Sequence, residues 1–375
     1  MSCCGSDIWL GEGETGLSIQ IQLTSECLNS CKHCYNTPGT IERIPLEKCK
    51  KIIDDFKETL DALNRKGRLI FTGGDVLMYP FFFEVLEYAC SVIPDIHIHI
   101  LGNPELLTDD IICRLKDSNV FAYQISLDGL EDTHDDIRHK GSFRDTLKKV
   151  QMLKSHDIRV DIRATLSGRN VGEIPELFDR MNAEGVHLFS IHRFVPVNTR
   201  RTGYDKDLNM IRPSEYKSFL LDMYNRHLRH TGNRCGVNVK EPLWKLIESE
   251  MGLKECDDWY FQDCFPGNRF AIVQNGDVQV CRMLPIPIGK VPEQRLIDII
   301  NFSPVLNKMK SLEAITKCGD CELRYSCGGC RALALCVYGS YFAPDPYCWR
   351  EKLSRREEYR VPVNAFDNEV RTYAE

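Results

Sequence analysis

Three cysteines near the N-terminus have a spacing that suits an iron–sulfur cluster. Cys27, Cys31 and Cys34 form a C-x3-C-x2-C segment. Three thiolates on a short loop can hold three corners of a cubane cluster and leave one iron without a protein ligand. Zinc is the rival metal, but structural zinc sites close with four protein ligands, and only His33 stands nearby as a further donor. The incomplete shell favours chemistry at the metal, which requires an open coordination position.

A second group of cysteines occupies the C-terminal third of the chain. It contains the two close pairs Cys318-x2-Cys321 and Cys327-x2-Cys330, which are compatible with a zinc ribbon. The number of thiols nevertheless exceeds one tetrahedral site. The nine members are Cys256, Cys264, Cys281, Cys318, Cys321, Cys327, Cys330, Cys336 and Cys348. The six remaining cysteines are scattered, and we expect them to be ordinary thiols: Cys3, Cys4, Cys49, Cys90, Cys113 and Cys235.

The composition indicates a reducing compartment for these thiols. The chain has 375 residues, of which 43% are hydrophobic and 18 are cysteine, enough to bury a sizeable core. No apolar run is long enough to span a membrane, and the first residues lack the pattern of a secretory signal. We therefore expect a cytoplasmic protein whose thiolates bind metal. The net charge of 48 − 54 = −6 argues against a general nucleic-acid binder.

Strand and helix patterns alternate through the first two thirds of the chain. Strands are expected at 17–23, 68–71, 96–101, 121–127, 159–166 and 187–195, and helices at 45–63, 80–93, 107–117, 143–155, 174–185 and 213–230. The first strand alternates apolar and polar residues as a half-buried strand does. Six strand–helix pairs with short connections predict an α/β fold with a parallel sheet, a partial (β/α)6 TIM-like barrel.

After residue 235 this rhythm is lost, and Gly, Pro and Cys dominate. We expect a small cysteine-rich Fe–S domain there. Its own hydrophobic core would be too small to stabilise it, so bound metal would have to do so. The predicted divisions are an N-terminal extension (1–16), the barrel (17–234), a bridging region (235–260), the cysteine-rich domain (261–350) and a tail (351–375).

The first cysteine segment, placed after the first strand, resembles that of the radical S-adenosylmethionine (radical SAM) superfamily. The resemblance implies a 4Fe–4S cluster on Cys27, Cys31 and Cys34, whose open iron is chelated by SAM. His33 stands where the family has an aromatic residue near the adenine. Without this cysteine segment, a Gly-Gly-Asp or a Ser-Leu-Asp-Gly sequence would be interpreted as a turn, and Arg138 as a solvated charge.

Three further motifs support the resemblance. Gly73-Gly74-Asp75 follows the second strand, where the family carries a Gly-Gly-Glu-like motif that receives the methionine amino group; Asp for Glu is a departure. The glycines are expected to let the backbone approach the ligand. Ser126-Leu127-Asp128-Gly129 ends the fourth strand, and Arg138 follows. The family's counterparts of Ser126 and Arg138 bind the SAM carboxylate and nearby groups, a role that a guanidinium suits.

The later cysteines resemble the SPASM extension of that superfamily, which holds two auxiliary Fe–S clusters, expected here to be 4Fe–4S. Cys264-x11-Gly276-x4-Cys281 opens the pattern. Two residues, rather than the family's three, separate Cys327 from Cys330, which puts the ligation in doubt. The resemblance implies an inner cluster on Cys264, Cys281 and Cys330 and an outer one on Cys318, Cys321, Cys327 and Cys348. The fourth inner ligand stays open between Cys256, Cys336 and an iron that accepts substrate.

The resemblance implies a reaction as well. One electron from flavodoxin or ferredoxin cleaves SAM, and the 5′-deoxyadenosyl radical removes hydrogen from a substrate, so no side chain is assigned as catalytic. Most members modify peptides, so we expect crosslinking or other maturation of a ribosomal peptide, with any leader-binding protein as a separate partner. Arg282 stands where the sulfatase maturases have a basic Asp, which disfavours that branch. The alternative is modification of a tetrapyrrole side chain. Residues 327–331 and 343–348 resemble both the haem-pathway enzymes and the pyrroloquinoline-quinone peptide cyclase. A zinc or Fe–S binding module is the non-enzymatic alternative, and nucleic-acid modification is disfavoured by the net charge.

Overall fold

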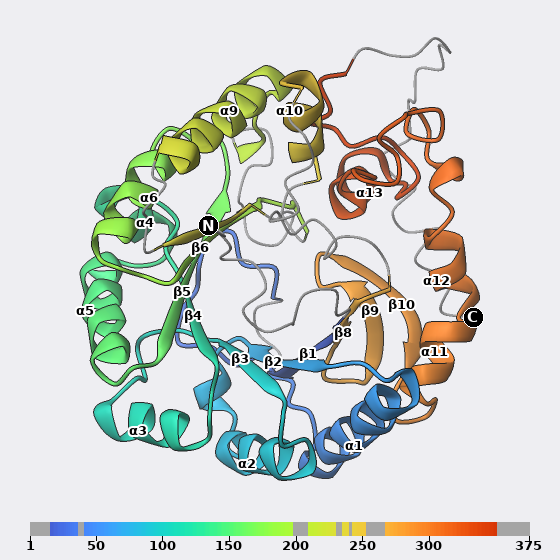
Figure 1. Ribbon diagram of the computed structural model, residues 1–375. Coiled ribbons are helices and arrows are strands. Elements are labelled where there is room, and N and C mark those ends of the chain that lie inside the picture. Colours follow the sequence, from blue (N-terminus) through green and yellow to red (C-terminus); the bar gives the residue numbers. More distant parts are fainter. Residues whose placement is uncertain are drawn as a thin grey trace.

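The computed structural model describes residues 16–36, 41–197, 209–229, 235–239, 242–252 and 267–350. Its centre is a curved ten-stranded sheet in the order β10-β9-β8-β1-β2-β3-β4-β5-β6-β7. Helices cover the outer face of this sheet, as Figure 1 shows. No helix of the described part of the chain is long and apolar enough to cross a membrane.

The elements have the following bounds. The strands are β1 (Leu17–Thr24), β2 (Gly67–Gly73), β3 (His97–Leu101), β4 (Ala122–Ser126), β5 (Arg159–Leu166), β6 (Leu188–Arg193), β7 (Gly236–Val239), β8 (Arg269–Ile272), β9 (Asp277–Cys281) and β10 (Leu284–Lys290). The helices are α1 (Leu46–Leu63), α2 (Phe82–Val92), α3 (Asp109–Asp117), α4 (Glu131–Ile137), α5 (Ser142–Ser155), α6 (Ile174–Ala183), α9 (Pro213–Arg229), α10 (Trp244–Glu250), α11 (Leu296–Phe302), α12 (Pro304–Met309) and α13 (Arg331–Tyr338), with one-turn 3-10 helices at Val76–Met78 (η1) and Leu312–Ala314 (η3).

Strands β1 to β7 pair in parallel, each with the next. This confirms the predicted partial barrel, and the six expected strand–helix pairs appear within a few residues of their expected bounds. The helices follow their apolar periodicity: α1 turns Ile52, Ile53 and Phe56 toward the sheet, where all three are buried.

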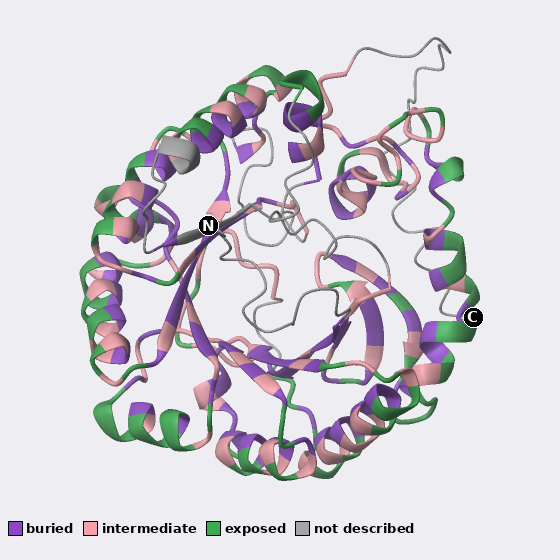
Figure 2. Cartoon of the chain, in the orientation of Figure 1, coloured by how far each residue is buried: buried purple, intermediate pink, exposed green. Residues whose placement is uncertain are grey.

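The expectation that the first strand is half-buried was wrong. The apolar residues Leu17, Ile19 and Ile21 are fully buried, but the alternating polar residues Ser18 and Gln22 are buried as well. Helices cover one face of the strand, and the barrel interior encloses the other. Figure 2 shows this burial along the central strands, while the exposed residues lie on the outer faces of the helices.

The cysteine-rich region continues the sheet of the barrel. β8 pairs in parallel with β1, with Ser18 opposite Arg269, and β9 and β10 follow as antiparallel strands. Buried side chains of this region, such as Leu284, Leu296 and Leu306, join those of the barrel in one hydrophobic core. The sequence feature that indicated this packing is the alternation of apolar residues in β10 (LPIPIGK). It was not identified as a strand because its prolines and glycine are typical of a loop.

A short helix that the sequence pattern missed lies between β4 and α5. This helix, α4, buries His134 and Ile137 and ends directly before Arg138. Its seven residues are too few for a clear helical period. It directs Arg138 toward the loop of the first cysteines.

Candidate functional site

The first cysteines lie on the loop that follows β1, at the end of the barrel where the parallel strands finish. The Sγ of Cys27 accepts hydrogen bonds from the Asn29 backbone N–H at 3.4 Å and from Asn103 Nδ2 at 3.0 Å. The Sγ of Cys31 lies 3.7 Å from Arg138 Nη1. Burial raises the pKa of the Cys31 thiol to about 11, and the Arg138 guanidinium opposes that rise. The donors at these sulfurs would stabilise thiolates that ligate iron.

The three thiols lie near enough to influence each other electrostatically. Within the described residues, no three His, Cys, Asp or Glu side chains converge as ligands of a single metal ion would. A cubane cluster binds each of its cysteines at a separate corner, and three neighbouring thiols on one loop are compatible with that arrangement.

Asp75 presents an unsatisfied oxygen beside this loop. Its side chain is completely buried and begins η1, where Oδ1 accepts the Leu77 N–H at 3.1 Å. Its Oδ2 has no hydrogen-bond partner among the described residues. Burial raises the pKa of Asp75 from its ordinary value of 3.8 to about 6, although the Leu77 N–H opposes the rise. A buried carboxylate oxygen without a donor is a binding point for a cationic group.

The glycines of this motif are required by the chain itself. A Cβ at Gly73 would lie 2.5 Å from the Thr24 carbonyl oxygen, and one at Gly74 would lie 2.2 Å from that of Glu26. The backbones are also hydrogen-bonded, since the Gly74 N–H donates to Thr24 O at 2.8 Å and the Asp75 N–H to Glu26 O at 2.7 Å. The close approach that these glycines allow is therefore to the segment leading into Cys27. Contact with a ligand stays a prediction.

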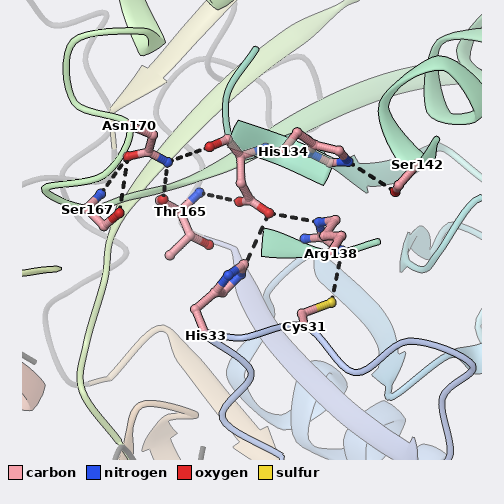
Figure 3. Close-up of polar contacts among 9 residues, drawn as sticks. Cys31, His33, His134, Arg138, Ser142, Thr165, Ser167 and Asn170 are labelled. Atoms are coloured by element: carbon pink, nitrogen blue, oxygen red, sulfur yellow. Dashed lines mark hydrogen bonds and ion pairs between the residues drawn. The ribbon is translucent and has the colours of Figure 1, made fainter. Parts of the chain in front are cut away.

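Asp128 is the centre of a buried polar network, and Figure 3 shows its labelled partners Arg138, Thr165 and Asn170. Its Oδ2 accepts from Arg138 Nε at 2.8 Å, its Oδ1 accepts from the Thr165 N–H at 2.9 Å, and His33 Nε2 lies 3.7 Å from Oδ2. Burial alone would raise the pKa of Asp128, but the Arg138 guanidinium opposes it most strongly, and the pKa is held below its usual range. Asp128 thus connects residues of three segments that lie far apart in the sequence.

Two further side chains hold the Asp128 backbone in place (Figure 3). His134 Nδ1 accepts the Asp128 N–H at 3.0 Å, and its Nε2 lies 3.2 Å from Ser142 Oγ. Burial lowers the pKa of His134 to about 4, so this ring is neutral and donates from Nε2. Asn170 Nδ2 donates to the Asp128 carbonyl at 2.6 Å and to the Thr165 carbonyl at 2.8 Å. The acid is therefore rigidly oriented.

Two of the predicted SAM contacts, Arg138 and Ser126, differ in their surroundings. Arg138, with 9% of its side chain exposed, is engaged by Asp128 and directed at Cys31. Ser126 is the last residue of β4 and pairs in register with Arg163 of β5. The sequence prediction missed Asp128, although it stands within the quoted Ser-Leu-Asp-Gly motif. A carboxyl group directly after a buried strand, ten residues before an arginine, was the available signal.

The later cysteines line two cavities. Cys318, Cys321, Cys327 and Cys348, the set expected for the outer cluster, line one cavity. Cys281 and Cys330, expected at the inner cluster, line another. Burial raises the pKa of Cys336 to about 12, and Cys330 and Cys281 add to that rise, which indicates that Cys336 lies near the inner pair. Cys256 and Cys264 lie outside the described residues.

The inner cavity connects the two groups of cysteines. It has a volume of about 220 Å³ and extends from Tyr35, beside Cys34, to Cys281 and Cys330. No Asp or Glu is found among the described residues that line it, whereas the basic side chains there are Arg163, His192, Arg193, Arg269, Arg282 and Arg331. Such a lining favours an anionic ligand.

Two family models match the chain. Residues 21–181 match the radical SAM superfamily, and residues 264–322 match SPASM, described as an iron–sulfur cluster-binding domain. Two solved structures resemble the fold with a TM-score of 0.70: SuiB of Streptococcus suis bound to S-adenosylmethionine (17% identical, covering 90% of this chain and 78% of that one) and native anSMEcpe with bound AdoMet (16% identical, 88% and 94%).

The curated relatives include haem-pathway enzymes and peptide-maturation proteins. An AdoMet-dependent heme synthase of Methanosarcina barkeri is 28% identical over 88% of this chain and 95% of its own length. The antilisterial bacteriocin subtilosin biosynthesis protein AlbA of Bacillus subtilis is 26% identical over 84% of this chain and 67% of its own length.

Proposed function

Because this chain belongs to the radical SAM superfamily and carries a SPASM domain, we propose that it removes hydrogen from the carboxylate side chains of a tetrapyrrole, using SAM. The observation that carries the proposal is the inner cavity. Its described lining contains five arginines and no acid, and one of these arginines, Arg193, is paired with the buried Asp345. Tetrapyrroles of the haem pathway carry several carboxylates, and a cationic cavity attracts and orients them.

The residues at the first loop fit the cofactors of this reaction. Cys27, Cys31 and Cys34 would hold a 4Fe–4S cluster, and the unsatisfied Asp75 Oδ2 would accept the ammonium group of SAM. Arg138, held by Asp128, would stand near the SAM carboxylate, and His33 near the adenine. When bound, SAM and the cluster supply a carbon radical that abstracts a hydrogen atom. The protein orients the reactants and excludes water.

The substrate proposed here replaces the peptide expected from the sequence. Removal of a hydrogen atom from the carbon next to the macrocycle leaves a propionate radical. This radical loses carbon dioxide and one electron and becomes a vinyl group. Cys281 and Cys330, both expected to hold the inner auxiliary cluster, line the cavity, and that cluster would accept the electron. Relatives named heme synthases support this choice.

An anaerobic assay tests the proposal. The reconstituted protein is mixed with SAM, a low-potential reductant (flavodoxin, ferredoxin or dithionite) and iron coproporphyrin III, which carries four propionates. We expect 5′-deoxyadenosine together with porphyrins that have lost carbon dioxide. The triple variant Cys27→Ala, Cys31→Ala, Cys34→Ala should yield neither. Formation of 5′-deoxyadenosine without any change in the porphyrin would contradict the substrate.

Peptide maturation is the second candidate. It is favoured by the likeness to AlbA and to the sporulation killing factor maturation protein SkfB, both of Bacillus subtilis. In that case a short precursor peptide encoded beside this gene, with a separate leader-binding protein, would be modified in the same assay. The mass of the peptide decides between the two candidates.

A further inference from the structure

Two arginines directly follow the cysteines that line the inner cavity. Cys281 precedes Arg282 and Cys330 precedes Arg331, and both arginines are themselves part of the cavity wall. We propose that Arg282 and Arg331 bind two carboxylate groups of one substrate molecule. The inference rests on the proposed function only in taking this cavity as the substrate site.

Arg282 is held in place without having its charge neutralised. It lies on the turn between β9 and β10, with its guanidinium carbon 4.9 Å from the centre of the Tyr35 ring. Its Nη1 donates to the side-chain oxygen of the buried Gln279 at 3.2 Å. Its Nε is buried and has no hydrogen-bond partner among the described residues. No carboxylate of the described chain forms an ion pair with Arg282. Its positive charge is therefore available to a ligand in the cavity.

The guanidinium of Arg331 is held in place through one of its nitrogens, Nη1. Its Nη1 donates to the carbonyl oxygens of Tyr341 at 2.8 Å and Ala343 at 2.7 Å. Its Nε and Nη2 are buried and have no partner among the residues the structure describes. These two nitrogens form the edge of a guanidinium that meets a carboxylate through two parallel hydrogen bonds. The bonds to the carbonyls therefore preorganise the edge that a ligand would need.

Arg193, on the same cavity wall, provides the contrast. It donates two hydrogen bonds of 2.8 Å to the two carboxylate oxygens of the buried Asp345. This pair shows how the chain balances a guanidinium where no ligand is required. Leaving buried donors unpaired is costly, and substrate carboxylates would remove that cost at Arg282 and Arg331.

The position of the two arginines also fixes the orientation of the substrate. Each carboxylate would lie beside a cysteine of the inner cluster, while the rest of the substrate faces Tyr35 and the first cysteine loop. A molecule with a single carboxylate would lack the second anchor. We therefore expect selection for substrates with at least two carboxylates.

Binding measurements on the reconstituted full-length protein test this inference. The probes are iron coproporphyrin III and its tetramethyl ester, followed by the shift of the porphyrin absorbance. For wild type we expect tighter binding of the acid than of the ester. Arg282→Gln should weaken binding of the acid by about 10- to 100-fold, the worth of a charge-assisted pair, and leave the ester unaffected. Arg282→Lys should retain part of the affinity, because the charge remains without the bidentate geometry.

Arg331→Gln should have the same effect, provided that its iron content and circular dichroism match wild type; the Arg282 variants decide if it fails to fold. Arg114→Gln is the matched control, because Arg114 also stacks on an aromatic ring, that of Phe83 at 3.5 Å, but lies on the outer helix α3. Its affinity for the acid should equal wild type.

Two results would overturn the inference: wild type that binds acid and ester equally, or Arg282→Gln that binds the acid as tightly as wild type. The failure of the proposed function looks different. A wild type that binds the acid through Arg282 but never decarboxylates it would refute the reaction and retain the carboxylate site. If Arg282→Gln decarboxylates the substrate as fast as wild type, the reaction is retained and the carboxylate site at Arg282 is refuted.

Discussion

Arg193 and Asp345 join the barrel to the cysteine-rich region through a buried, doubly hydrogen-bonded ion pair. Both Nη–Oδ distances are 2.8 Å, and Arg193 is the last residue of β6. Asp345 also accepts the backbone N–H groups of Cys330 at 2.6 Å and Tyr347 at 2.9 Å. Burial opposes ionisation of Asp345, but Arg193 outweighs it and lowers the pKa of this carboxyl. One carboxylate therefore places an auxiliary cysteine relative to the barrel.

Asp345→Asn should destabilise the protein by roughly 3–5 kcal/mol, since it leaves the Arg193 charge buried without a counter-ion. Denaturant unfolding monitored by circular dichroism measures this change. The matched control is Glu58→Gln, which breaks the exposed pair with Arg295 and should cost at most about 1 kcal/mol. Equal effects of the two substitutions would contradict the structural role of the buried pair.

Asp75→Asn should stabilise the cluster-free protein at neutral pH while weakening SAM binding. Burial raises the pKa of Asp75 to about 6, so this acid favours folding only at low pH, and the contribution is lost as the pH rises through that value. The variant should gain roughly 1–3 kcal/mol over wild type above that pH, and the gain should vanish toward acid pH. Unfolding curves across pH measure the first effect. SAM-induced changes in the spectrum of the reduced cluster measure the second, and their full retention would exclude Asp75 as a SAM contact.

Gly74→Ala should displace the first cysteine loop. The added methyl group would meet the Glu26 carbonyl oxygen at 2.2 Å, which requires movement of the backbone leading into Cys27. We expect a loss of about 1–3 kcal/mol and a lower iron content after reconstitution. Gly172→Ala is the matched control, because a Cβ there meets no atom within 4 Å and the residue has no positive φ. Normal iron loading of Gly74→Ala would show that the loop tolerates the shift.

Asp128→Asn should disturb the cluster environment more than it disturbs the fold around it. The side chain keeps its shape, so the Thr165 N–H can still be accepted, but Arg138 loses its counter-ion beside Cys31. We expect a weaker SAM response and a shifted reduction potential of the first cluster. Asp61→Asn, which removes an exposed acid paired with Lys57 on helix α1, is the control and should leave the potential unchanged.

The sequence predicted the parts of the molecule that depend on local patterns. The helical period of α1 and the spacing of Cys27, Cys31 and Cys34 are both contained in short segments, so the barrel and the first loop were recognisable. The pairing of β1 with β8 and the gathering of Tyr35, Arg282 and Arg331 around one cavity depend on contacts between distant segments. No periodicity reports such contacts. Asp128 was missed because its pairing with Arg138 and Thr165 becomes evident only when the fold brings these residues together.

The parallel pairing of β1 with β8 also determines the order in which parts of the sheet can form during synthesis. The ribosome releases the N-terminal strand first, yet the edge of β1 opposite β2 finds its partner only when Arg269–Ile272 have been made. Until then the strand that leads into the iron-binding loop has an unpaired edge, which is prone to association with other chains. Insertion of the first cluster into a finished pocket must therefore follow synthesis of residues 269–272, about three quarters of the way along the 375-residue chain. A nascent chain truncated before β8 would expose that edge and its cysteines together.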